Sequence, residues 1–291
     1  MPENSQPLTP HSPQPMVSII IVNYNSLHLI EDCIESIIAR TSGIDYEIIV
    51  VDNASQPGCG DILSRRFGGR VRTLELPDNV GFGGANNEGF NIARGEYLFC
   101  LNPDTLLVNN AVKMLAECLD CYPQAGACGG NLFGPDMRKA HSFRRITPGL
   151  FWEISERLRR HPERLIFGRN TRFNKSSRIK SVGYITGADL MLRRTALEQT
   201  GGFSPEFFMY FEDTDLCRRL RKLGWKLLSV PQAKIIHLEG GSFKTDDSEE
   251  TRRKMMRRIE MYEQNRHTYY RLHHSPLMHR LCDAIHRPPK I

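Results

Sequence analysis

The sequence lacks any apolar run of the roughly 18 to 20 residues that a transmembrane helix requires. Its longest mainly apolar stretch, 17–22, has the length of a buried strand. The first 15 residues are polar and rich in proline, without the apolar core of a signal peptide. These absences predict a cytosolic protein. With 291 residues, 40% of them hydrophobic and 25% charged, the chain can bury a substantial core.

The sequence also lacks a complete set of zinc ligands. Cys118, Cys121 and Cys128 lie close together, but no second pair of cysteine or histidine residues completes a zinc site. In the cytosol the eight cysteines would be reduced. We therefore expect buried structural thiols rather than a zinc knuckle.

Basic residues far outnumber acidic ones in the second half of the chain. Residues 1–150 contain 11 Lys and Arg against 16 Asp and Glu, a net charge of −5, whereas residues 151–291 contain 28 against 17, a net of +11. The second half should therefore meet an anionic partner, such as a phosphorylated substrate, a membrane surface or nucleic acid. No recognised nucleic-acid-binding module accompanies the charge, so we expect no nucleic acid.

Apolar stretches alternate with segments of helical spacing. The expected strands cover 17–22, 46–51, 71–76 and 97–101, and the expected helices 26–38, 61–67 and 84–93. This alternation is typical of a mostly parallel, doubly wound α/β sheet. Further along, we expect helices at 150–160, 195–199, 212–222 and 249–272, strands at 184–193 and 225–230, with 234–237 following, and a loose tail.

Polar segments follow the first four strands. They are Asn23-Tyr24-Asn25, Asp52-Asn53-Ala54-Ser55, Asp78-Asn79 and Asn102-Pro103-Asp104. Because the carboxyl ends of parallel strands meet at one edge, where ligands of such sheets bind, these segments should line one site.

Asp104 is a candidate metal ligand. An isolated carboxylate at a strand end can hold a divalent cation against a phosphate, because Mg²⁺ usually takes one or two carboxylates and completes its shell with phosphate oxygens and water. His237 follows the apolar Ile235 and Ile236. Its imidazole could complete the same shell, although a histidine in this position is also often structural. We expect Mg²⁺ or Mn²⁺ at Asp104 and His237.

Two further segments could contact a nucleotide or sugar. Asp52 can accept hydrogen bonds from a base or ribose, or else cap the segment that follows it. The glycine-rich segment 79–87 runs into a helix and can approach a phosphate or sugar closely. Asn86 stands where a dinucleotide-binding fingerprint needs its third glycine, which argues against hydride transfer. We expect Asn86 and Asn87 to contact a sugar or ribose.

Asp213 is the candidate general base. Glu212, Asp213 and Asp215 crowd negative charge into one helical turn, and their repulsion raises carboxylate pKa values. A raised pKa suits a carboxylate for accepting a proton from a hydroxyl. The alternative is that these are ordinary acids of a helix N-terminus, paired with Arg218 or Arg219.

Together these residues resemble glycosyltransferase family 2, and within it the bacterial rhamnosyltransferase-like branch. The matching segments are 17–25, 51–55, 79–89, 101–104, 201–203 and 211–215, within about residues 17–242. The resemblance implies the GT-A fold, an α/β structure with a Rossmann-like, mostly parallel central sheet flanked by helices, here with a basic helical C-terminal extension. It also implies transfer of a sugar from a nucleotide diphosphate donor with inversion at the anomeric carbon.

The resemblance assigns roles to single residues. Asp52 is similar to the base-binding acid, Asp104 to the last acid of the metal motif, Asp213 to the catalytic base and His237 to the late metal ligand. The usual Asp-x-Asp motif appears here as Asn102-Pro103-Asp104, so one carboxylate is lost. The donor-binding residues it implies are Asn23, Asn25, Asp52, Ser55, Asn79, Gly83, Asn86, Asn87, Asn102 and Asp104.

The partners it implies are a nucleotide-sugar donor, with dTDP-rhamnose favoured, and a saccharide or polyprenyl-diphosphate-linked acceptor of bacterial cell-surface polysaccharide synthesis. The basic helix at 249–272 could lie on the inner membrane surface, or pack on the catalytic domain. We expect a flexible leader at 1–15, a catalytic domain at 16–245 with a nucleotide-binding half to about 130, and the extension at 246–291. The expected location is cytoplasmic, or peripheral on the inner face of the membrane.

Two other functions fit part of the pattern. A nucleotidyltransferase would show a glycine-rich loop with Lys or Arg after the first strand, where this chain has Asn23-Tyr24-Asn25-Ser26. A catalytically silent nucleotide-sugar or lipid-binding protein could keep the fold, although the presence of Asp213 argues against it.

Overall fold

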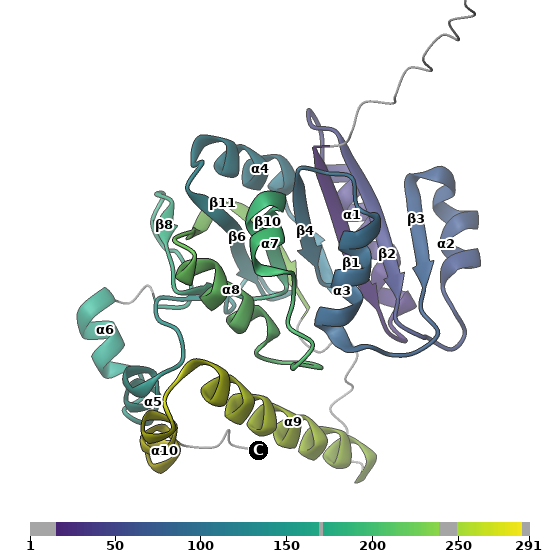
Figure 1. Cartoon of the computed structure of the whole chain (residues 1–291). Coiled ribbons are helices and arrows are strands. Elements are labelled where there is room, and N and C mark those ends of the chain that lie inside the picture. Colours follow the sequence, from purple (N-terminus) through teal and green to yellow (C-terminus); the bar gives the residue numbers. More distant parts are fainter. Residues whose placement is uncertain (1–15, 169–170, 239–248, 287–291) are drawn as a thin grey trace, which may run out of the picture.

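The computed structural model describes residues 16–168, 171–238 and 249–286, with a nine-stranded sheet at its centre (Figure 1). Four parallel strands form one side of this sheet, in the order β3-β2-β1-β4. Their bounds are β1 Val17–Asn23, β2 Tyr46–Asp52, β3 Val71–Glu75 and β4 Tyr97–Leu101. These are the strands predicted from the apolar stretches, and the α/β class is confirmed.

The other side of the sheet is mixed. Strand β10 (Asp189–Arg193) runs antiparallel to both β4 and β6 (Ala125–Phe133). Strand β11 (Lys226–His237) is parallel to β6 and antiparallel to β5 (Thr105–Leu107) and β8 (Lys180–Ser181). The parallel pairs of the sheet, which was expected to be mostly parallel, are those among β1–β4 and the β6–β11 pair.

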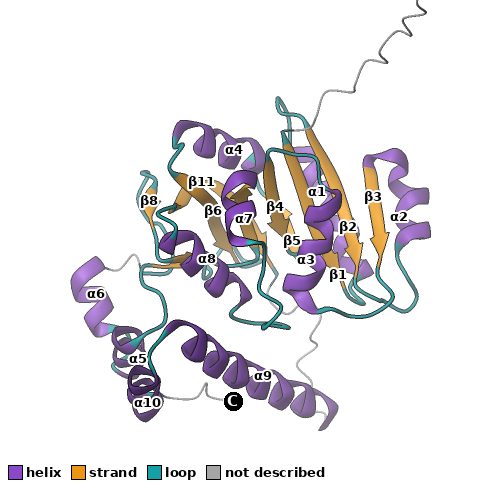
Figure 2. Cartoon of the chain, in the orientation of Figure 1, coloured by secondary structure: helices purple, strands orange, loops and turns teal. Residues whose placement is uncertain are grey.

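Helices cover both faces of the sheet (Figure 2). Along β1, Ile19 and Ile21 point to one face, whereas Ile20 and Val22 point to the other. The first face is covered by α1 (Leu27–Arg40), α2 (Gly60–Phe67) and α4 (Ala111–Cys121), and the second by α3 (Gly81–Ile92), α7 (Arg194–Thr200) and α8 (Glu212–Lys222). Burial on both faces explains why the strands read as continuous apolar runs.

Four helices form a lobe beside the sheet (Figure 1). They are α5 (Leu150–Arg157), α6 (His161–Phe167), α9 (Glu249–His273) and α10 (Pro276–Ile285). The prediction of a loose C-terminal tail is wrong for residues 276–285. There, Pro276 occupies the first turn of α10, and the Ser275 hydroxyl caps it by accepting a hydrogen bond from Met278 N at 3.3 Å.

Two other predicted elements differ from the structure. The expected strand at 184–193 is interrupted, because β9 (Tyr184–Ile185) pairs with β7 (Phe143–Arg144) in a separate small sheet before β10 begins at Asp189. The segments 225–230 and 234–237, in contrast, join in the single strand β11. The interruption at 186–188 becomes important at the site described below.

The strands of the two expected halves of the catalytic domain share one sheet. The predicted leader at 1–15 and the predicted boundary at 245–246 lie outside the described residues, so the domain division stays a prediction. All eight cysteines are free thiols, and all except Cys121 are buried. Among the described helices, none combines the length and apolarity needed to cross a bilayer.

Candidate active site

The loops after β1 and β2 are tied together by side-chain hydrogen bonds. Asn23 is fully buried, and its amide nitrogen donates to the Ser55 hydroxyl at 3.1 Å. The same hydroxyl accepts from Asn25 N at 2.9 Å, and the Asn25 side chain accepts from Gln56 N. Three of the expected donor-binding residues thus lie together at the carboxyl edge of the sheet, where they hold the two loops in one arrangement.

Asp52 lies beneath these loops. Its two carboxylate oxygens accept hydrogen bonds from Ser55 N at 2.9 Å and from Cys59 N at 2.6 Å. Burial opposes ionisation, but these hydrogen bonds outweigh it and lower the pKa of Asp52. The carboxylate is therefore charged and fixes the loop that follows β2. The capping role is visible in the structure, and contact with a base stays a prediction.

The glycine-rich segment closes against a distant loop. Asn79 Oδ1 accepts from Gly81 N at 3.0 Å and from the Asn53 amide at 2.8 Å. Gly81 has a φ of +79°, and a Cβ there would lie 2.2 Å from the carbonyl oxygen of Phe208. Phe82 N donates to that same oxygen at 3.0 Å. Only glycine fits this approach, which brings the start of α3 against the segment preceding α8.

Gly83, Asn86 and Asn87 lie on the first turns of α3. A Cβ at Gly83 would lie 3.0 Å from Phe203 Cβ, so this glycine allows close packing. Asn87 binds the Phe203 backbone through both ends of its amide, each at 2.9 Å. Asn86 donates to Phe82 O, and its buried Oδ1 has no hydrogen-bond partner among the described residues. Asn86 is therefore the better placed of the two asparagines to contact a ligand.

Asp104 and His237 come together from residues 133 positions apart, because β5 pairs with the end of β11. The register places Thr105 opposite His237, and Leu238 N donates to Asp104 O at 2.9 Å. His237 Nε2 lies 3.2 Å from Asp104 Oδ1 and 3.4 Å from Asn102 Nδ2. Asn102 Oδ1 is buried without a hydrogen-bond partner in the described part of the chain. Asp104, His237 and Asn102 thus lie close together, and their role as metal ligands stays a prediction.

The interruption between β9 and β10 connects this cluster to Asp213. Asn102 N donates to Ala188 O at 3.0 Å, and the preceding residue, Gly187, donates its N–H to Asp213 Oδ2 at 2.9 Å. The turn at 186–188 therefore fixes Asp213 relative to the Asn102-Pro103-Asp104 segment.

Backbone strain and burial are concentrated at the start of α8. Tyr210 and Phe211 both have positive φ, 72° and 68°, which is rare for bulky side chains. Burial is the main cause that raises the pKa of Asp213 above its ordinary value. Burial and the neighbouring Asp213 carboxylate raise the pKa of Glu212 to about 8. The pair keeps a proton near neutral pH, while Asp213 is tuned toward accepting one.

Asp213 lines a cavity of about 330 Å³. Its walls come mainly from β7, β9, α5, the segment before α8, and α9. They include aromatic side chains (Trp152, Tyr184, Tyr210, Phe211 and Tyr262) and basic ones (His141, Arg144 and Arg172). Sequence patterns did not reveal these wall residues, since the segment around 147–180 is weakly patterned. The only available signal was its excess of Arg and Lys.

A family model described as glycosyl transferase family 2 matches residues 18–201. This chain belongs to glycosyltransferase family 2. The match covers the donor-side loops, Asp104 and the turn at 186–188. Asp213, His237 and the helices α9 and α10 lie beyond it.

The individual relatives and solved structures share less than a third of their residues with this chain. The N-acetylglucosaminyl-diphospho-decaprenol L-rhamnosyltransferase of Mycobacterium tuberculosis is 28% identical over 239 residues, which cover 76% of each chain. Mannosyltransferase PcManGT from Pyrobaculum calidifontis, solved with GDP-Man and Mn²⁺, superposes with a TM-score of 0.58 at 17% identity, covering 93% of this chain and 69% of that one. GalNAc-T7, solved with UDP, GalNAc and Mn²⁺, gives 0.59 at 17% identity, covering 78% of this chain and 44% of that one. These likenesses confirm the GT-A fold.

Proposed function

We propose that this glycosyltransferase transfers a sugar from a nucleotide diphosphate donor to an acceptor hydroxyl with inversion at the anomeric carbon. The observation that carries the proposal is the turn at 186–188, which hydrogen-bonds both Asn102 and Asp213. A candidate base facing a cavity is thereby held next to a candidate diphosphate site. A silent binding protein has no need of this connection.

In the proposed reaction, Asp213 takes the proton of the acceptor hydroxyl as that oxygen attacks the anomeric carbon. The bond between this carbon and the donor diphosphate breaks, and its electron pair leaves with the nucleoside diphosphate. Gly187 N holds Asp213 Oδ2, which leaves the carboxylate oriented toward the cavity. The raised pKa of Asp213 favours proton uptake.

The chain's own donor groups fit a divalent cation. Asp104 Oδ1 and His237 Nε2 are 3.2 Å apart, a separation that two ligands of one ion can adopt, and the unpartnered Asn102 Oδ1 lies beside them. When bound, Mg²⁺ or Mn²⁺ would neutralise charge developing on the leaving diphosphate. Two structural neighbours were solved with Mn²⁺.

The donor would occupy the carboxyl edge of the sheet. Asn79, Gly83 and Asn86 would approach its sugar or ribose, and Asp52 would keep the base-side loop in place. The relative from M. tuberculosis is described as a rhamnosyltransferase, which favours dTDP-rhamnose as the donor and polysaccharide synthesis as the process.

The acceptor would enter the cavity at Asp213. That relative's description names a diphospho-decaprenol acceptor, so we propose a lipid-linked saccharide here and a position at the inner membrane surface. The helical lobe carries apolar side chains at its surface, including Leu165 at 87% and Leu277 at 69% exposure. Exposed Arg159, Arg164 and Arg280 lie on the same helices or next to them. Such a mixture suits an anionic membrane surface.

Thermal stabilisation by nucleotide sugars tests the proposal. The protein would be titrated with dTDP-rhamnose, UDP-sugars and GDP-sugars, with and without Mn²⁺. A ligand at 100 times its dissociation constant adds about 2.7 kcal/mol to the free energy of unfolding, an easily measured shift. Metal-dependent stabilisation by dTDP-rhamnose supports the rhamnosyl donor, and a preference for another nucleotide changes the sugar only. No shift with any nucleotide sugar contradicts the proposal.

A further inference from the structure

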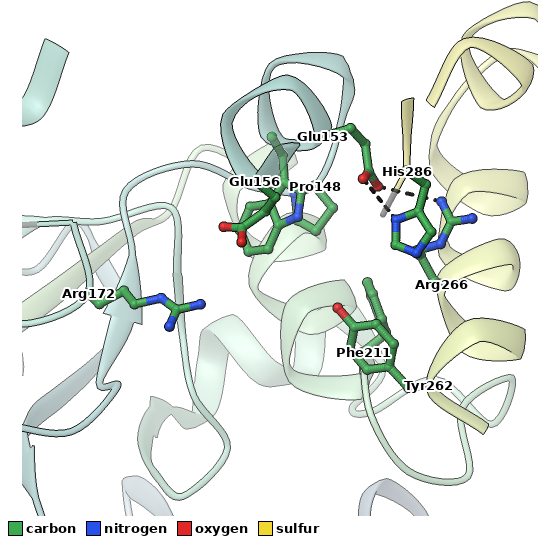
Figure 3. A pocket seen from close by; sticks show the side chains of 9 residues that line it. Pro148, Glu153, Glu156, Arg172, Phe211, Tyr262, Arg266 and His286 are labelled. Carbon is green, nitrogen blue, oxygen red and sulfur yellow. Dashed lines mark hydrogen bonds and ion pairs between the residues drawn. The ribbon is translucent and has the colours of Figure 1, made fainter. Parts of the chain in front are cut away.

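The cavity at Asp213 is lined by Arg172, whose guanidinium has no partner among the described side chains or backbone groups. Arg172 lines both this cavity and the adjoining one drawn in Figure 3, where its guanidinium points toward Glu156. Its side chain has no hydrogen bond or ion pair among the described residues, and its Nε is buried without a partner. Its backbone carbonyl accepts from Ser142 N at 2.9 Å and from Phe143 N, so the base of the side chain is fixed. An unpaired, partly buried cation is costly unless a ligand compensates it.

Most of the other charged groups around this guanidinium already have partners. Arg144 is buried, stacks over the Trp152 ring at 3.7 Å, and pairs with Glu156 at 2.7 Å and Glu163 at 2.9 Å. On the opposite wall, Glu153 pairs with His286 at 3.0 Å and lies 3.5 Å from Arg266 (Figure 3). Glu156 faces Arg172 but makes no ion pair with it. In the described part of the chain, the guanidiniums left here without an ion pair are therefore those of Arg172 and the nearby Arg160, and Arg172 is the one that lines the cavity with Asp213.

His141 supplies a second unsatisfied group on the same wall. Its Nε2 is buried without a hydrogen-bond partner among the described residues. Burial and the nearby guanidiniums of Arg172, Arg144 and Arg160 lower the pKa of His141 to about 3. The imidazole is therefore neutral. Its single N–H donates to the Phe143 backbone, which leaves the unpartnered Nε2 as a hydrogen-bond acceptor.

We propose that Arg172 forms an anion subsite which binds a phosphate or diphosphate group of the acceptor, next to the hydroxyl that Asp213 deprotonates, while Nε2 of His141 can accept a hydrogen bond from a hydroxyl of the same ligand. A planar guanidinium matches phosphate oxygens with paired hydrogen bonds. Trp152, Tyr184 and Tyr262 offer aromatic faces to the sugar attached to that group. The subsite rests on the proposed function for its place in the reaction, but its binding of a diphosphate does not depend on turnover.

Binding of an alkyl diphosphate tests the subsite without any reaction. The chain has two tryptophans, and Trp152 lines the cavity, so a Trp225→Phe background makes its fluorescence a local reporter. Geranyl diphosphate, neutral geraniol and inorganic pyrophosphate would each be titrated in the presence of chelator, which keeps them from a metal at Asp104. Arg172→Gln is compared with Arg178→Gln, the same change at an exposed arginine outside the cavity lining.

Geranyl diphosphate should change the Trp152 fluorescence, and geraniol should not. Its dissociation constant should rise about tenfold or more in Arg172→Gln, because a charge-assisted hydrogen bond is lost, and should not change in Arg178→Gln. Inorganic pyrophosphate should displace it, which assigns the recognition to the anion rather than to the lipid chain. Equal binding of geraniol, no displacement by pyrophosphate, or unchanged binding in Arg172→Gln would each overturn the subsite.

Turnover then separates this inference from the proposed function. With a diphosphate-linked acceptor and the matching neutral glycoside, Arg172→Gln should raise KM for the charged acceptor by a similar factor and leave kcat and the neutral acceptor almost unchanged. An equal loss with both acceptors overturns the subsite while leaving the glycosyltransferase intact. If neither acceptor reacts but the alkyl diphosphate still binds through Arg172, the subsite stands and the proposed reaction fails.

Discussion

At the scale of single residues, the metal pair depends on one strand register. Because β5 pairs with β11, Asp104 and His237 meet at 3.2 Å. Asp104→Ala removes the carboxylate of this pair and leaves the packed strands unchanged. We expect metal-dependent turnover to fall at least about a hundredfold, since even the groups that merely orient metal ligands cost 10- to 100-fold when removed.

The control for Asp104→Ala is Asp136→Ala, which removes an exposed carboxylate paired only with Arg138. Both variants should unfold within a few degrees of the wild type, and the control should keep full turnover. Wild-type activity that persists in excess chelator would count against the metal role.

The raised pKa of Glu212 predicts how stability depends on pH. Its pKa rises from 4.5 to about 8 in the folded chain, because of burial and the neighbouring Asp213. The folded state therefore holds a proton that the unfolded chain releases above its ordinary pKa, and the stabilising effect of that proton is lost as pH rises from about 4.5 to about 8. Glu212→Gln, which cannot ionise, should gain stability relative to the wild type as pH increases through this window.

Thermal unfolding of the wild type and Glu212→Gln at pH 5 and pH 9 measures this effect. The difference in unfolding temperature should be larger at pH 9. Glu206→Gln, at an exposed carboxylate paired with Arg271, should show little change. A Glu212→Gln difference that is the same at both pH values would contradict the buried, protonated glutamate.

At the scale of elements, the glycine-rich segment and the loop before α8 act as one unit. Gly81 has positive φ and nearly touches Phe208 O. Gly81→Ala should cost about 1–3 kcal/mol from backbone strain alone, and the steric overlap adds to it. Displacement of the start of α3 should also raise KM for the donor. Unfolding temperature and donor KM would be compared with those of Gly69→Ala, where a Cβ meets open space; equal effects of the two variants would refute the close approach.

Elements with strong local patterns could be predicted from the sequence. Strands β1, β2 and β4 are buried on both faces, and the acids and bases of α8 suit its dipole. The break between β9 and β10 was missed, although Gly187 and Asp189 interrupt the apolar pattern of residues 184–193; the pairing of β9 with β7 could not be read from the sequence. Similarly, the glycines of segment 79–87 were visible, but their contact with Phe208 links residues far apart in the sequence.

Some residues of the candidate site could likewise be predicted from the sequence, and others could not. Asp104, His237 and Asp213 were predicted by residue type and position at strand or helix ends. Asn87 was also predicted to contact the donor, but its amide hydrogen-bonds the Phe203 backbone instead. That partner lies 116 residues away, so the contact could not be read from the sequence. His141, Trp152 and Arg172 could not be predicted either, because the cavity forms only when β7, α5 and α9 assemble around the start of α8.

At the scale of the whole molecule, the C-terminal helices support the catalytic face. Tyr269 of α9 is fully buried, packs against Phe211 at 5.5 Å between ring centroids, and accepts a hydrogen bond from Arg218 at 3.2 Å. His273 Nε2 lies 2.6 Å from Asp215 Oδ1. The first half of α9 is largely exposed, so packing on the domain is visible for its second half, and contact of its basic first half with a membrane stays a prediction.

Tyr269→Ala tests this support. Losing a buried aromatic ring should lower the free energy of unfolding by about 3 kcal/mol or more. Turnover should fall as well, because Phe211 directly precedes the Glu212-Asp213 turn. Leu272→Ala, at an exposed position on the same helix, should have little effect on either. If Tyr269→Ala matched this control in chemical denaturation and in turnover, the lobe would be independent of the site.

The central claim is that Asp213 is the base of a sugar transfer reaction. The direct measurement is release of nucleoside diphosphate from the best-binding nucleotide sugar, with acceptor present, by the wild type and by Asp213→Asn. The amide keeps an oxygen for Gly187 N but cannot take a proton, so kcat should fall about 10²- to 10⁴-fold while the donor still stabilises the fold. Turnover by Asp213→Asn at the wild-type rate would contradict the account.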